Sequence, residues 1–174
     1  MIAAGVDSRE LAAQVGIELP ITPERRRLAY TEPLTARTMS PLVVALERGF
    51  AGKQLLNGVF YLGWLGETEE SDNLTFIERA LSAGETLLPA LAELPVRRVV
   101  EGLYDSTPDH RPILGKAASG LFLATGFSGH GFMLAPAVGK MMADLIANGD
   151  EDPLFEEFTL QRFAEATSKE GLQI

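Results

Sequence analysis

Residues 125–137 read TGFSGHGFMLAPA and place three glycines within six positions. A short run of apolar β-formers, residues 121–124, comes just before this stretch, and a long helical pattern follows it and ends near Asn148. A strand is therefore predicted to lead into a glycine-rich turn that opens a helix. Such a turn presents free backbone N–H groups and the positive end of a helix dipole. Because glycine has no side chain, a flat or anionic ligand can approach this backbone closely.

The order of these glycines separates the turn from two better-known motifs. It is Gly-x-x-Gly-x-Gly, whereas the dinucleotide-binding fingerprint is Gly-x-Gly-x-x-Gly and needs a second strand ending in an acid about 20 residues further on. Here Asp150, Glu151 and Asp152 follow a helix end, and no strand precedes them. The hydrolase elbow Gly-x-Ser-x-Gly fails because His130 stands at its last position. Taken alone, the turn fits either a ligand site or a tight packing turn without a ligand.

A second segment, residues 102–115, reads GLYDSTPDHRPILG and contains Thr107-Pro108-Asp109, a turn signature whose aspartate can accept hydrogen bonds from nearby backbone. The two segments carry Gly-x-Tyr-x-x-Thr-Pro-Asp-x-x-Pro-Ile-x-Gly and Gly-Phe-Ser-Gly-His-Gly-Phe-x-x-Ala-Pro-Ala. In type, order and separation these motifs resemble the C-terminal part of the D-amino-acid oxidase, glycine oxidase and sarcosine oxidase β-subunit family of FAD-dependent oxidoreductases. Residues 19–34 resemble the start of that family's substrate domain, so the resemblance covers almost all 174 residues.

The resemblance implies an enzyme that uses FAD to oxidise the C–N bond of an amino acid or of a secondary or tertiary amine. The implied fold class is α+β, with an antiparallel substrate-type sheet, packed helices and a C-terminal strand-turn-helix remnant of the FAD-binding domain. We expect a remnant of the FAD-binding domain over residues 1–18, a substrate-type domain over 19–101, and a flavin-edge segment over 102–174.

Relatives in this family begin with a βαβ unit that binds the ADP half of FAD through Gly-x-Gly-x-x-Gly, and this motif does not occur in the chain. The chain is therefore expected to correspond to the C-terminal half of the enzyme and to need the N-terminal dinucleotide-binding half in cis or in trans. As an isolated chain it is expected to be inactive and to self-associate. The alternative is a non-catalytic truncated fragment or assembly module that does not bind flavin without that half.

The resemblance also implies roles for individual residues. Flavin-dependent amine oxidation places negative charge on one edge of the flavin, where a helix N-terminus can stabilise it, and the matching segment lies along this edge in relatives. Tyr104 stands where the family places a side chain that faces the substrate, and His130 is expected to contact the flavin or, alternatively, only to pack beside the turn. These two residues are the catalytic candidates. The cofactor-binding candidates are Gly102, Thr107, Pro108, Asp109, Gly126, Ser128, Gly129, His130, Gly131, Phe132 and Met133.

Two positions depart from the family pattern. Some relatives that bind an amino-acid carboxylate have an arginine at the position of Tyr104, and some sarcosine-oxidising relatives have a lysine at the position of Met133. These departures leave room for a bulkier or more apolar amine, or for a carboxylate held elsewhere. Arg48 and Lys53 are candidate anchors for an anion, with an ordinary surface charge as the alternative for each.

The composition limits the kinds of partner and site that the chain can have. A formal net charge of −9 argues against a nucleic-acid partner, which requires a clustered basic surface. The one basic run, residues 25–27, is typical of a strand with solvated and paired faces. The sequence has no cysteine, which excludes disulfides, and no apolar run long enough to span a membrane. With two histidines and no further ligands at suitable spacing, no metal site is expected, and a cytoplasmic location is the default.

Strand and turn signals predict an antiparallel meander ahead of the two motifs. Residues 54–64 are divided by Asn57-Gly58, a strong signal for a two-residue hairpin turn. The other strands are expected over residues 24–31, 42–48 (closed by 49–52) and 96–104.

Two helices are predicted outside the glycine-rich segment. The first spans residues 8–15 with Ser8 as its N-cap. The second begins with a capping box formed by Thr75 and Glu78, and Pro89 should kink or end it. Its apolar face is expected to consist of Leu74, Ile77, Leu81, Gly84, Leu88 and Leu91.

The last helix is expected to begin between Gly131 and Ala135, because Pro136 is tolerated within a first turn. Lys140 and Asp144 mark its solvent side. Two neighbouring apolar stripes are expected in the core: Leu134, Val138, Met141 and Leu145, and beside them Ala135, Gly139, Met142 and Ile146.

Overall fold

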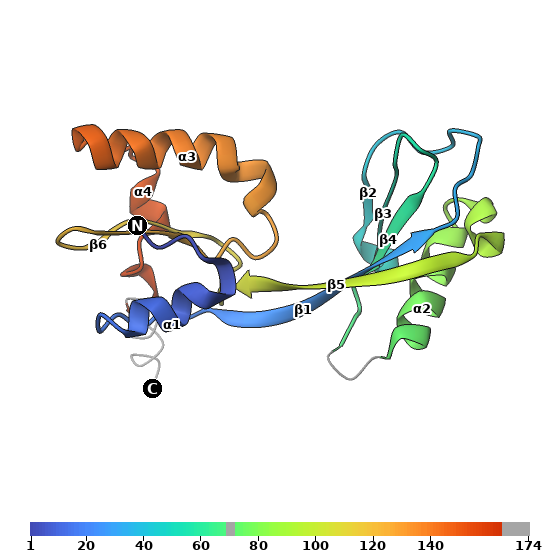
Figure 1. Ribbon diagram of the computed structural model, residues 1–174, viewed down its shortest axis with the longest axis horizontal. Coiled ribbons are helices and arrows are strands. Elements are labelled where there is room, and N and C mark those ends of the chain that lie inside the picture. The colour runs from blue at the N-terminus through green and yellow to red at the C-terminus, as the bar shows by residue number, and fades with distance from the viewer. Residues whose placement is uncertain (69–71, 165–174) are drawn as a thin grey trace. The chain divides into compact units, whose positions relative to one another are not determined.

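A computed structural model describes residues 1–68 and 72–164 (Figure 1). The chain divides into two units: unit 1 is Met1–Glu24 with Leu103–Ile174, and unit 2 is Arg25–Gly102. Two long strands, β1 (Thr22–Thr31) and β5 (Val96–Ser106), cross the boundary between the units. Each unit has hydrophobic clusters of its own.

Unit 2 is built on a sheet whose strands follow the order β2-β3-β4-β1-β5. Here β2 is Val43–Ala45, β3 is Phe50–Gln54 and β4 is Phe60–Trp64, and β3 pairs antiparallel with both of its neighbours. The turn between β3 and β4 contains Asn57-Gly58, and Gly58 has the positive φ (+85°) that such a turn requires. The predicted antiparallel hairpin and meander are therefore confirmed, but the turn is not the predicted two-residue one: Leu55 N donates to Val59 O at 2.8 Å, which leaves a loop of three residues, 56–58.

One face of this sheet carries the core of unit 2. Burial alternates along β3, as expected for a strand with one face against a core. The helix α2 (Asn73–Glu85) and the short 3-10 helix η3 (Pro89–Glu93) pack on that face. The buried cluster comprises Ala29, Met39, Ala45, Phe50, Phe60, Leu62, Phe76, Ala80 and Leu91.

The basic run at the start of unit 2 is used within the fold. Arg27 is only 3% exposed, its guanidinium pairs with the Glu67 carboxylate, and its Nη1 donates to Asn73 Oδ1 at 2.8 Å. Arg25 lies 3.7 Å from the carboxylate of Glu101. These arginines therefore have partners inside the protein, as the sequence indicated.

The N-cap of α2 differs from the prediction. Asp72 occupies the cap, and its Oδ1 accepts a hydrogen bond from Thr75 N at 2.7 Å. Thr75 therefore lies inside the first turn, and the predicted capping box with Glu78 is wrong. The reason is that an aspartate caps a helix as well as a threonine does, so the earlier of two competing signals begins the helix.

The buried face of α2 also differs from the predicted one. It is formed by Phe76, Ala80 and Gly84, whereas Leu74 is 71% exposed. A Cβ at Gly84 would lie 2.7 Å from the ring of Phe50, so close packing of the helix on this aromatic sets its rotation. The helix ends before Pro89, which instead opens η3.

The predicted strand over residues 42–48 is mostly not a strand. Its last three residues form a 3-10 helix, η2 (Leu46–Arg48), which ends at Gly49 with φ +65°. Gly52, expected to close the strand, lies within β3 instead. A Cβ at Gly52 would come 2.5 Å from Phe50 Cζ, so this glycine makes room for an aromatic ring and does not form a turn.

Unit 1 is layered around a hairpin of two strands. These are β6 (Ile113–Ala118) and β7 (Leu121–Thr125), and Ile2 adds a parallel bridge to β7. The helix α3 (Gly131–Asn148) packs on one face of the hairpin, and the segment containing α1 (Ser8–Ala13) packs on the other (Figure 1). The remaining short elements of unit 1 are η1 (Gly5–Asp7) and α4 (Phe155–Phe158).

Two helix starts in unit 1 need correction. Ser8 is the first residue of α1 and not its N-cap, because its Oγ accepts a hydrogen bond from Ala4 N at 3.0 Å. The start of α3 at Gly131 agrees with the prediction, but Pro136 lies in the second turn. Proline has no N–H there, so the carbonyl of Phe132 lacks its usual helical donor. The first turn of α3 bends away from the rest of the helix (Figure 1).

Candidate functional site

Hydrogen bonds join the two sequence motifs within unit 1. Thr107 N donates to Ser128 Oγ at 3.2 Å, and Gly126 N donates to the carboxylate of Asp105 at 2.7 Å. Ser128 N also donates to the carbonyl of Asp105 at 3.3 Å. Thr107 and Ser128 are buried, so the bond between them forms away from solvent. The end of β5 and the glycine turn are thus one connected structure.

The backbone of the glycine turn suits few residue types. Gly126, Ser128 and Gly129 have φ of +73°, +51° and +87°. A Cβ at Gly126 would lie 2.5 Å from Thr107 Cγ2, and a Cβ at Gly129 would overlap the ring of Tyr104. The glycines are therefore needed for the close approach of β5 as well as for the left-handed backbone.

The Thr-Pro-Asp turn is held by an arginine that belongs to neither motif. Arg162 Nε donates to Asp109 Oδ2 at 2.8 Å, and its Nη2 donates to Oδ1 at 3.0 Å. Asp109 Oδ1 also accepts from Arg111 N at 3.1 Å and from Thr107 Oγ1 at 3.2 Å. The hydrogen bond from Arg162 lowers the pKa of Asp109 to about 2. Asp109 is therefore a turn cap whose partners come from the protein itself.

The helix α3 opens directly behind the glycine turn. His130 occupies the N-cap without a capping side-chain hydrogen bond, and the first turn contains no acidic residue. The first intrahelical hydrogen bond runs from Leu134 N to His130 O at 3.3 Å. The N–H groups of residues 131–133 come before that bond, so the positive end of the helix dipole lies at the turn.

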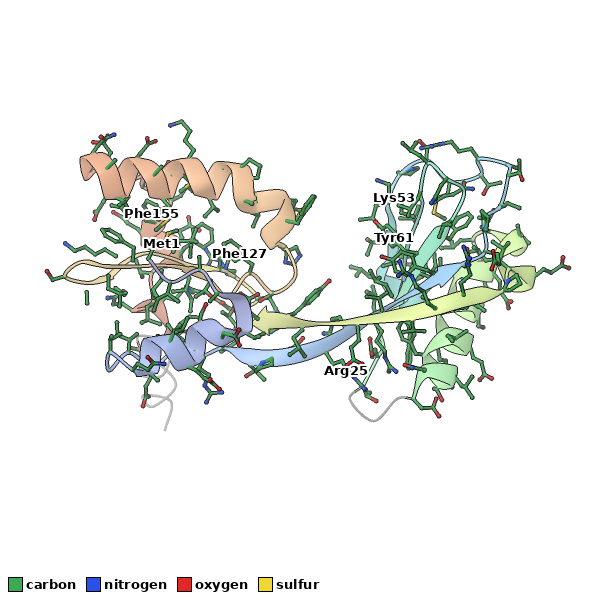
Figure 2. The ribbon with its side chains drawn as sticks, in the orientation of Figure 1. Met1, Arg25, Lys53, Tyr61, Phe127 and Phe155 are labelled. Atoms are coloured by element: carbon green, nitrogen blue, oxygen red, sulfur yellow. The ribbon has the colours of Figure 1, made fainter. Side chains whose placement is uncertain are left out.

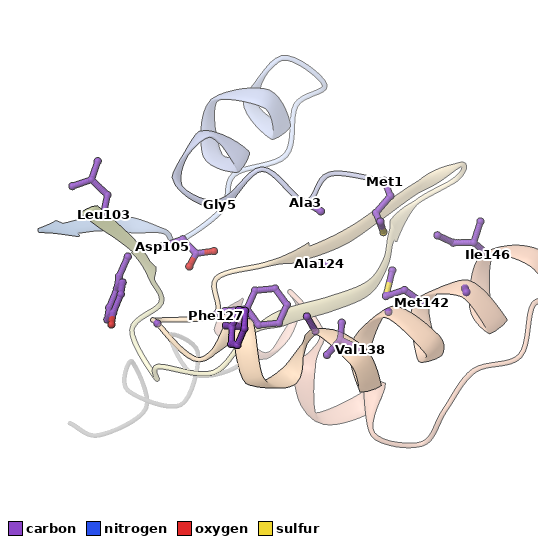
Figure 3. A pocket seen from close by; sticks show the side chains of 17 residues that line it. Met1, Ala3, Gly5, Leu103, Asp105, Ala124, Phe127, Val138, Met142 and Ile146 are labelled. Atoms are coloured by element: carbon purple, nitrogen blue, oxygen red, sulfur yellow. The ribbon is translucent and has the colours of Figure 1, made fainter. Parts of the chain in front are cut away.

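A cavity of about 600 Å³ borders the turn and α3 (Figure 3). Its lining is mostly apolar, and Asp105 contributes the one acidic side chain among the lining residues. The volume is typical of a site for an organic ligand. The lining residues are Met1, Ala3, Gly5, Leu103, Tyr104, Asp105, Ala124, Phe127, Gly129, Gly131, Phe132, Ala135, Val138, Gly139, Met142, Ala143 and Ile146.

Of the two stripes of α3 that were expected in the core, the second lines this cavity, although its Met142 is only 3% exposed and belongs to the buried cluster as predicted. The stripe of Leu134, Val138, Met141 and Leu145 packs against β6 and β7, as predicted. In the neighbouring stripe, Ile146 is 46% exposed, and no atom lies within 4 Å of a Cβ placed on Gly139. The small residues Ala135, Gly139 and Ala143, spaced by four, are the signal in the sequence that points to an open helix face.

The structure brings some predicted site residues to the cavity and leaves others outside its lining. Tyr104, Gly129, Gly131 and Phe132 line it. Gly126, Thr107 and Ser128 are buried behind the turn and shape it. The remaining candidates are exposed and do not line the cavity, namely Gly102 on β5, Pro108 and Asp109 in the Thr-Pro-Asp turn, His130 at the N-cap of α3 and Met133 in its first turn.

Sequence reasoning missed two residues that organise the site. Asp105 was only a variable position in the motif, yet its side chain and backbone hold both Gly126 and Ser128. Arg162 lies after the last helix pattern, and no motif marks it. Each acts through a contact between distant segments, which spacing along the chain does not reveal.

The two candidate anion anchors lie in unit 2. Arg48 Nη1 donates to Thr86 Oγ1 at 3.1 Å, and Arg48 Nε lies 3.9 Å from the carboxylate of Glu47, so Arg48 has partners on its own surface. Lys53 lies on β3, directly opposite Tyr61 of β4.

Residues 1–145 match the family described as FAD dependent oxidoreductase, and the chain belongs to this family. Its members use FAD as the cofactor. A curated relative, sarcosine oxidase subunit beta of Rhodobacter capsulatus, is 30% identical over 172 residues, which are 95% of this chain and 40% of that protein. FAD-dependent oxidoreductase domain-containing protein 1 of Xenopus laevis is 29% identical over 173 residues, which are 92% of this chain and 35% of that protein.

A solved structure shows the same fold. The L-proline dehydrogenase of P. horikoshii superposes with a TM-score of 0.85 at 29% identity, and the match covers 94% of this chain and 46% of that chain. The chain therefore spans less than half the length of these relatives. In the described residues, no helix is both long enough and apolar enough to cross a membrane.

Proposed function

We propose that the chain supplies the substrate-domain and flavin-edge part of an FAD-dependent enzyme that oxidises the C–N bond of an amino acid or of a secondary or tertiary amine. The observation that carries this proposal is the open N-terminus of α3, set behind the glycine turn and against the apolar cavity. The similarity to a sarcosine oxidase subunit beta and to an L-proline dehydrogenase supports the substrate class.

The residues present fit a flavin at this place. The side of α3 that borders the cavity carries Ala135, Gly139 and Ala143, and a Cβ on Gly139 would meet nothing within 4 Å. A planar ring system can therefore approach the helix closely. Gly129, Gly131, Phe132 and Tyr104 would contact the cofactor, which, when bound, accepts the equivalent of a hydride from the substrate carbon.

The chain itself would orient the bound flavin and the substrate, and it would stabilise the charge that develops during the reaction. With a flavin bound beside the turn, the N–H groups at the start of α3 would stabilise negative charge on it without reorganisation, because the turn already holds them in place. The bonds from Asp105 to Gly126 and from Thr107 to Ser128 maintain that geometry. Tyr104, at the edge of the same cavity, would face the substrate, and His130 would raise the local positive potential.

The proposal includes a second part of the enzyme, because no fingerprint for the ADP half of FAD is present in the sequence. We infer that a dinucleotide-binding half, joined in cis or supplied in trans, completes the site. Phe132 is 98% exposed and Met133 is 67% exposed, which fits a surface that another segment covers. The second candidate function, a non-catalytic fragment or assembly module, keeps this surface but never holds flavin.

Flavin retention separates these two functions. The purified chain should be colourless, because half of a binding site loses most ligand contacts while association still costs entropy. Combined with a dinucleotide-binding half, it should acquire flavin absorbance that is bleached by an accepted amine such as sarcosine or L-proline. Failure to retain flavin in any such combination would support the non-catalytic alternative.

A matched pair of variants in the reconstituted enzyme locates the cofactor edge. Gly131→Leu should reduce flavin retention by about tenfold or more, because Gly131 lines the cavity and a side chain would also press on Phe127, 3.3 Å from its Cβ. Lys140→Leu should change little, because Lys140 is exposed and pairs with Asp144 on the solvent side of the same helix. Circular dichroism should confirm that both variants fold. Equal flavin retention in the two would show that the flavin lies elsewhere.

A further inference from the structure

The side chain of Arg162 forms a hydrogen-bonded contact between two segments of unit 1. It is 14% exposed and makes five hydrogen bonds, as many as a guanidinium has N–H groups. Two of these bonds go to the carboxylate of Asp109, and a third goes to the carbonyl of Arg111 at 2.8 Å. The other two go to the carbonyls of Phe158 and Thr159, at 3.1 and 2.9 Å. The guanidinium therefore joins its own segment to the Thr-Pro-Asp turn.

The segment that carries Arg162, residues 155–164, is also anchored to unit 1 by apolar packing. Phe155 of α4 is 6% exposed and belongs to the buried cluster that includes Leu145 of α3. Phe127 of the glycine turn packs against the same cluster, and Figure 2 labels both phenylalanines on this unit. The segment therefore provides a packed base from which Arg162 reaches the Thr-Pro-Asp turn.

Thr107 connects Asp109 to the glycine turn. Its Oγ1 lies 3.2 Å from Asp109 Oδ1, and its backbone N–H donates to Ser128 Oγ at 3.2 Å. A Cβ at Gly126 would lie 2.5 Å from Thr107 Cγ2, so the methyl group of Thr107 fills the space beside this glycine. Because Thr107 is only 2% exposed and closely packed, its displacement would also displace the glycine turn. A continuous series of contacts thus runs from Arg162 to the turn that opens α3.

Both turns in this series hold a strained backbone. Among the described residues, 1–68 and 72–164, His110 and Ser128 are the non-glycine residues with positive φ, at +54° and +51°. His110 lies in the Thr-Pro-Asp turn, and Ser128 lies in the glycine turn. Such a conformation is unfavourable for residues with a side chain and persists only where surrounding contacts hold it. Contacts from outside the two turns, such as those of Arg162, are therefore needed to keep this geometry.

We propose that Arg162 is a positioning residue of the enzyme: it holds Asp109 and Thr107 so that the glycine turn keeps the N–H groups at the start of α3 in place. An arginine suits this role because its planar guanidinium bonds both carboxylate oxygens and three backbone carbonyls at once, whereas a lysine has three donors. The family match covers residues 1–145, and Arg162 lies after it. The effect on flavin chemistry rests on the proposed function, whereas the effect on the conformation of the glycine turn does not.

The first test uses the full chain without flavin. In the 15N-labelled protein, Arg162→Lys should shift the backbone amide signals of Gly126 and Ser128, because three donors cannot bond all five acceptors. Unchanged signals of the glycine turn in this variant would overturn the proposal. Arg162→Ala should shift the same signals further. Guanidinium chloride, at concentrations that leave the parent folded, should return them toward the parent positions, and sodium chloride should not. Circular dichroism checks that each variant folds, and Arg162→Lys decides if Arg162→Ala does not.

Arg111→Gln is the matched control. It removes one positive charge beside the same turn, but the Arg111 guanidinium lies on the surface, 2.7 Å from the carboxylate of Glu157. An exposed ion pair of this kind contributes little, so the amide shifts should stay near Glu157 and leave Gly126 and Ser128 unchanged. Shifts at the glycine turn as large as those of Arg162→Lys would mean that any loss of charge here disturbs the turn, and would overturn the specific role of Arg162.

The second test uses the reconstituted enzyme. Arg162→Lys should slow flavin reduction at saturating amine by about tenfold, because displaced N–H groups at the start of α3 stabilise the developing charge less well. The midpoint potential of the bound flavin should fall for the same reason, and Arg111→Gln should leave both unchanged. A folded Arg162→Lys enzyme with the parent rate and potential would overturn the positioning role. A parent enzyme that retains no flavin would instead count against the proposed function, and the amide signals of the isolated chain would still decide the role of Arg162.

Discussion

Two turns in this chain depend on glycine in different ways. In unit 2, Gly58 completes a hairpin turn, and Leu34 N donates to its carbonyl at 3.0 Å. In unit 1, the turn at Gly126 and Gly129 is held by side chains from β5, a strand that lies about twenty residues earlier in the sequence. Both turns hold glycine at positive φ, but a Cβ at Gly58 would meet a backbone atom, the carbonyl oxygen of Leu34, whereas a Cβ at Gly126 or Gly129 would meet a side chain. Substitutions at the two places should therefore differ in cost, because a side chain can move aside more easily than the backbone.

The largest loss of stability is expected for Gly58→Ala. The residue has φ +85°, and a Cβ would lie 2.5 Å from the carbonyl oxygen of Leu34. A backbone atom cannot move aside easily, so left-handed strain and overpacking add to roughly 3 kcal/mol. Trp64, the one tryptophan of the chain, lies in β4 and reports unfolding of unit 2 by fluorescence. A midpoint equal to that of the parent chain would mean that the turn tolerates a different geometry.

A smaller loss is expected for Gly129→Ala. The φ of +87° costs about 1–2 kcal/mol for alanine. The overlapping group is the ring of Tyr104, which is 40% exposed and can rotate away. Gly129→Ala should therefore change the shape of the cavity more than it lowers the free energy of unfolding. Adding Tyr104→Ala should relieve the steric part of the loss.

Denaturation of all four forms, the parent, both single variants and the double variant, measures this coupling. Strictly additive losses would show that Tyr104 does not constrain the turn. In the reconstituted enzyme, Gly129→Ala should also weaken flavin retention, since Gly129 lines the cavity.

Asp109→Asn should cost about 1 kcal/mol at neutral pH, after allowance for the solvent that screens this partly exposed pair. The pKa of Asp109 is lowered from 3.8 to about 2 in the folded chain. Its stabilisation is therefore fully present above the unfolded pKa near 4 and is lost as the pH falls through about 2. Urea unfolding between pH 2 and pH 5 should show a weaker pH dependence in the variant, and identical slopes would contradict the role of the Arg162 contact.

The smallest effect is expected for Gly139→Ala, which tests the open side of α3. This glycine lies within the helix, and a Cβ added to it would have no atom within 4 Å, so alanine should stabilise the chain by up to about 1 kcal/mol. The gain should appear in the isolated chain as a higher denaturation midpoint. A loss of stability would mean that the cavity side of α3 is packed more tightly than the structure shows.

The difference between local signals and contacts between distant segments explains which elements could be predicted from the sequence. The hairpin at Asn57-Gly58, the strand leading to Ser106 and the helix from Gly131 to Asn148 follow from local signals: a turn dipeptide, β-branched runs and an apolar period that ends at glycine. The caps of α1 and α2 were misplaced because several residues near each start can accept the same hydrogen bond. The family likewise followed from two local motifs.

Local backbone preferences and short motifs in the sequence thus determined the element types, the antiparallel meander and the family. Only the tertiary structure decided which faces these elements bury and which side chains meet. It turned α2 so that Gly84 meets Phe50, directed one stripe of α3 into a cavity, and brought Arg162 to Asp109 and Asp105 to Gly126. These outcomes depend on contacts between residues far apart in the chain, whose energies no single segment contains.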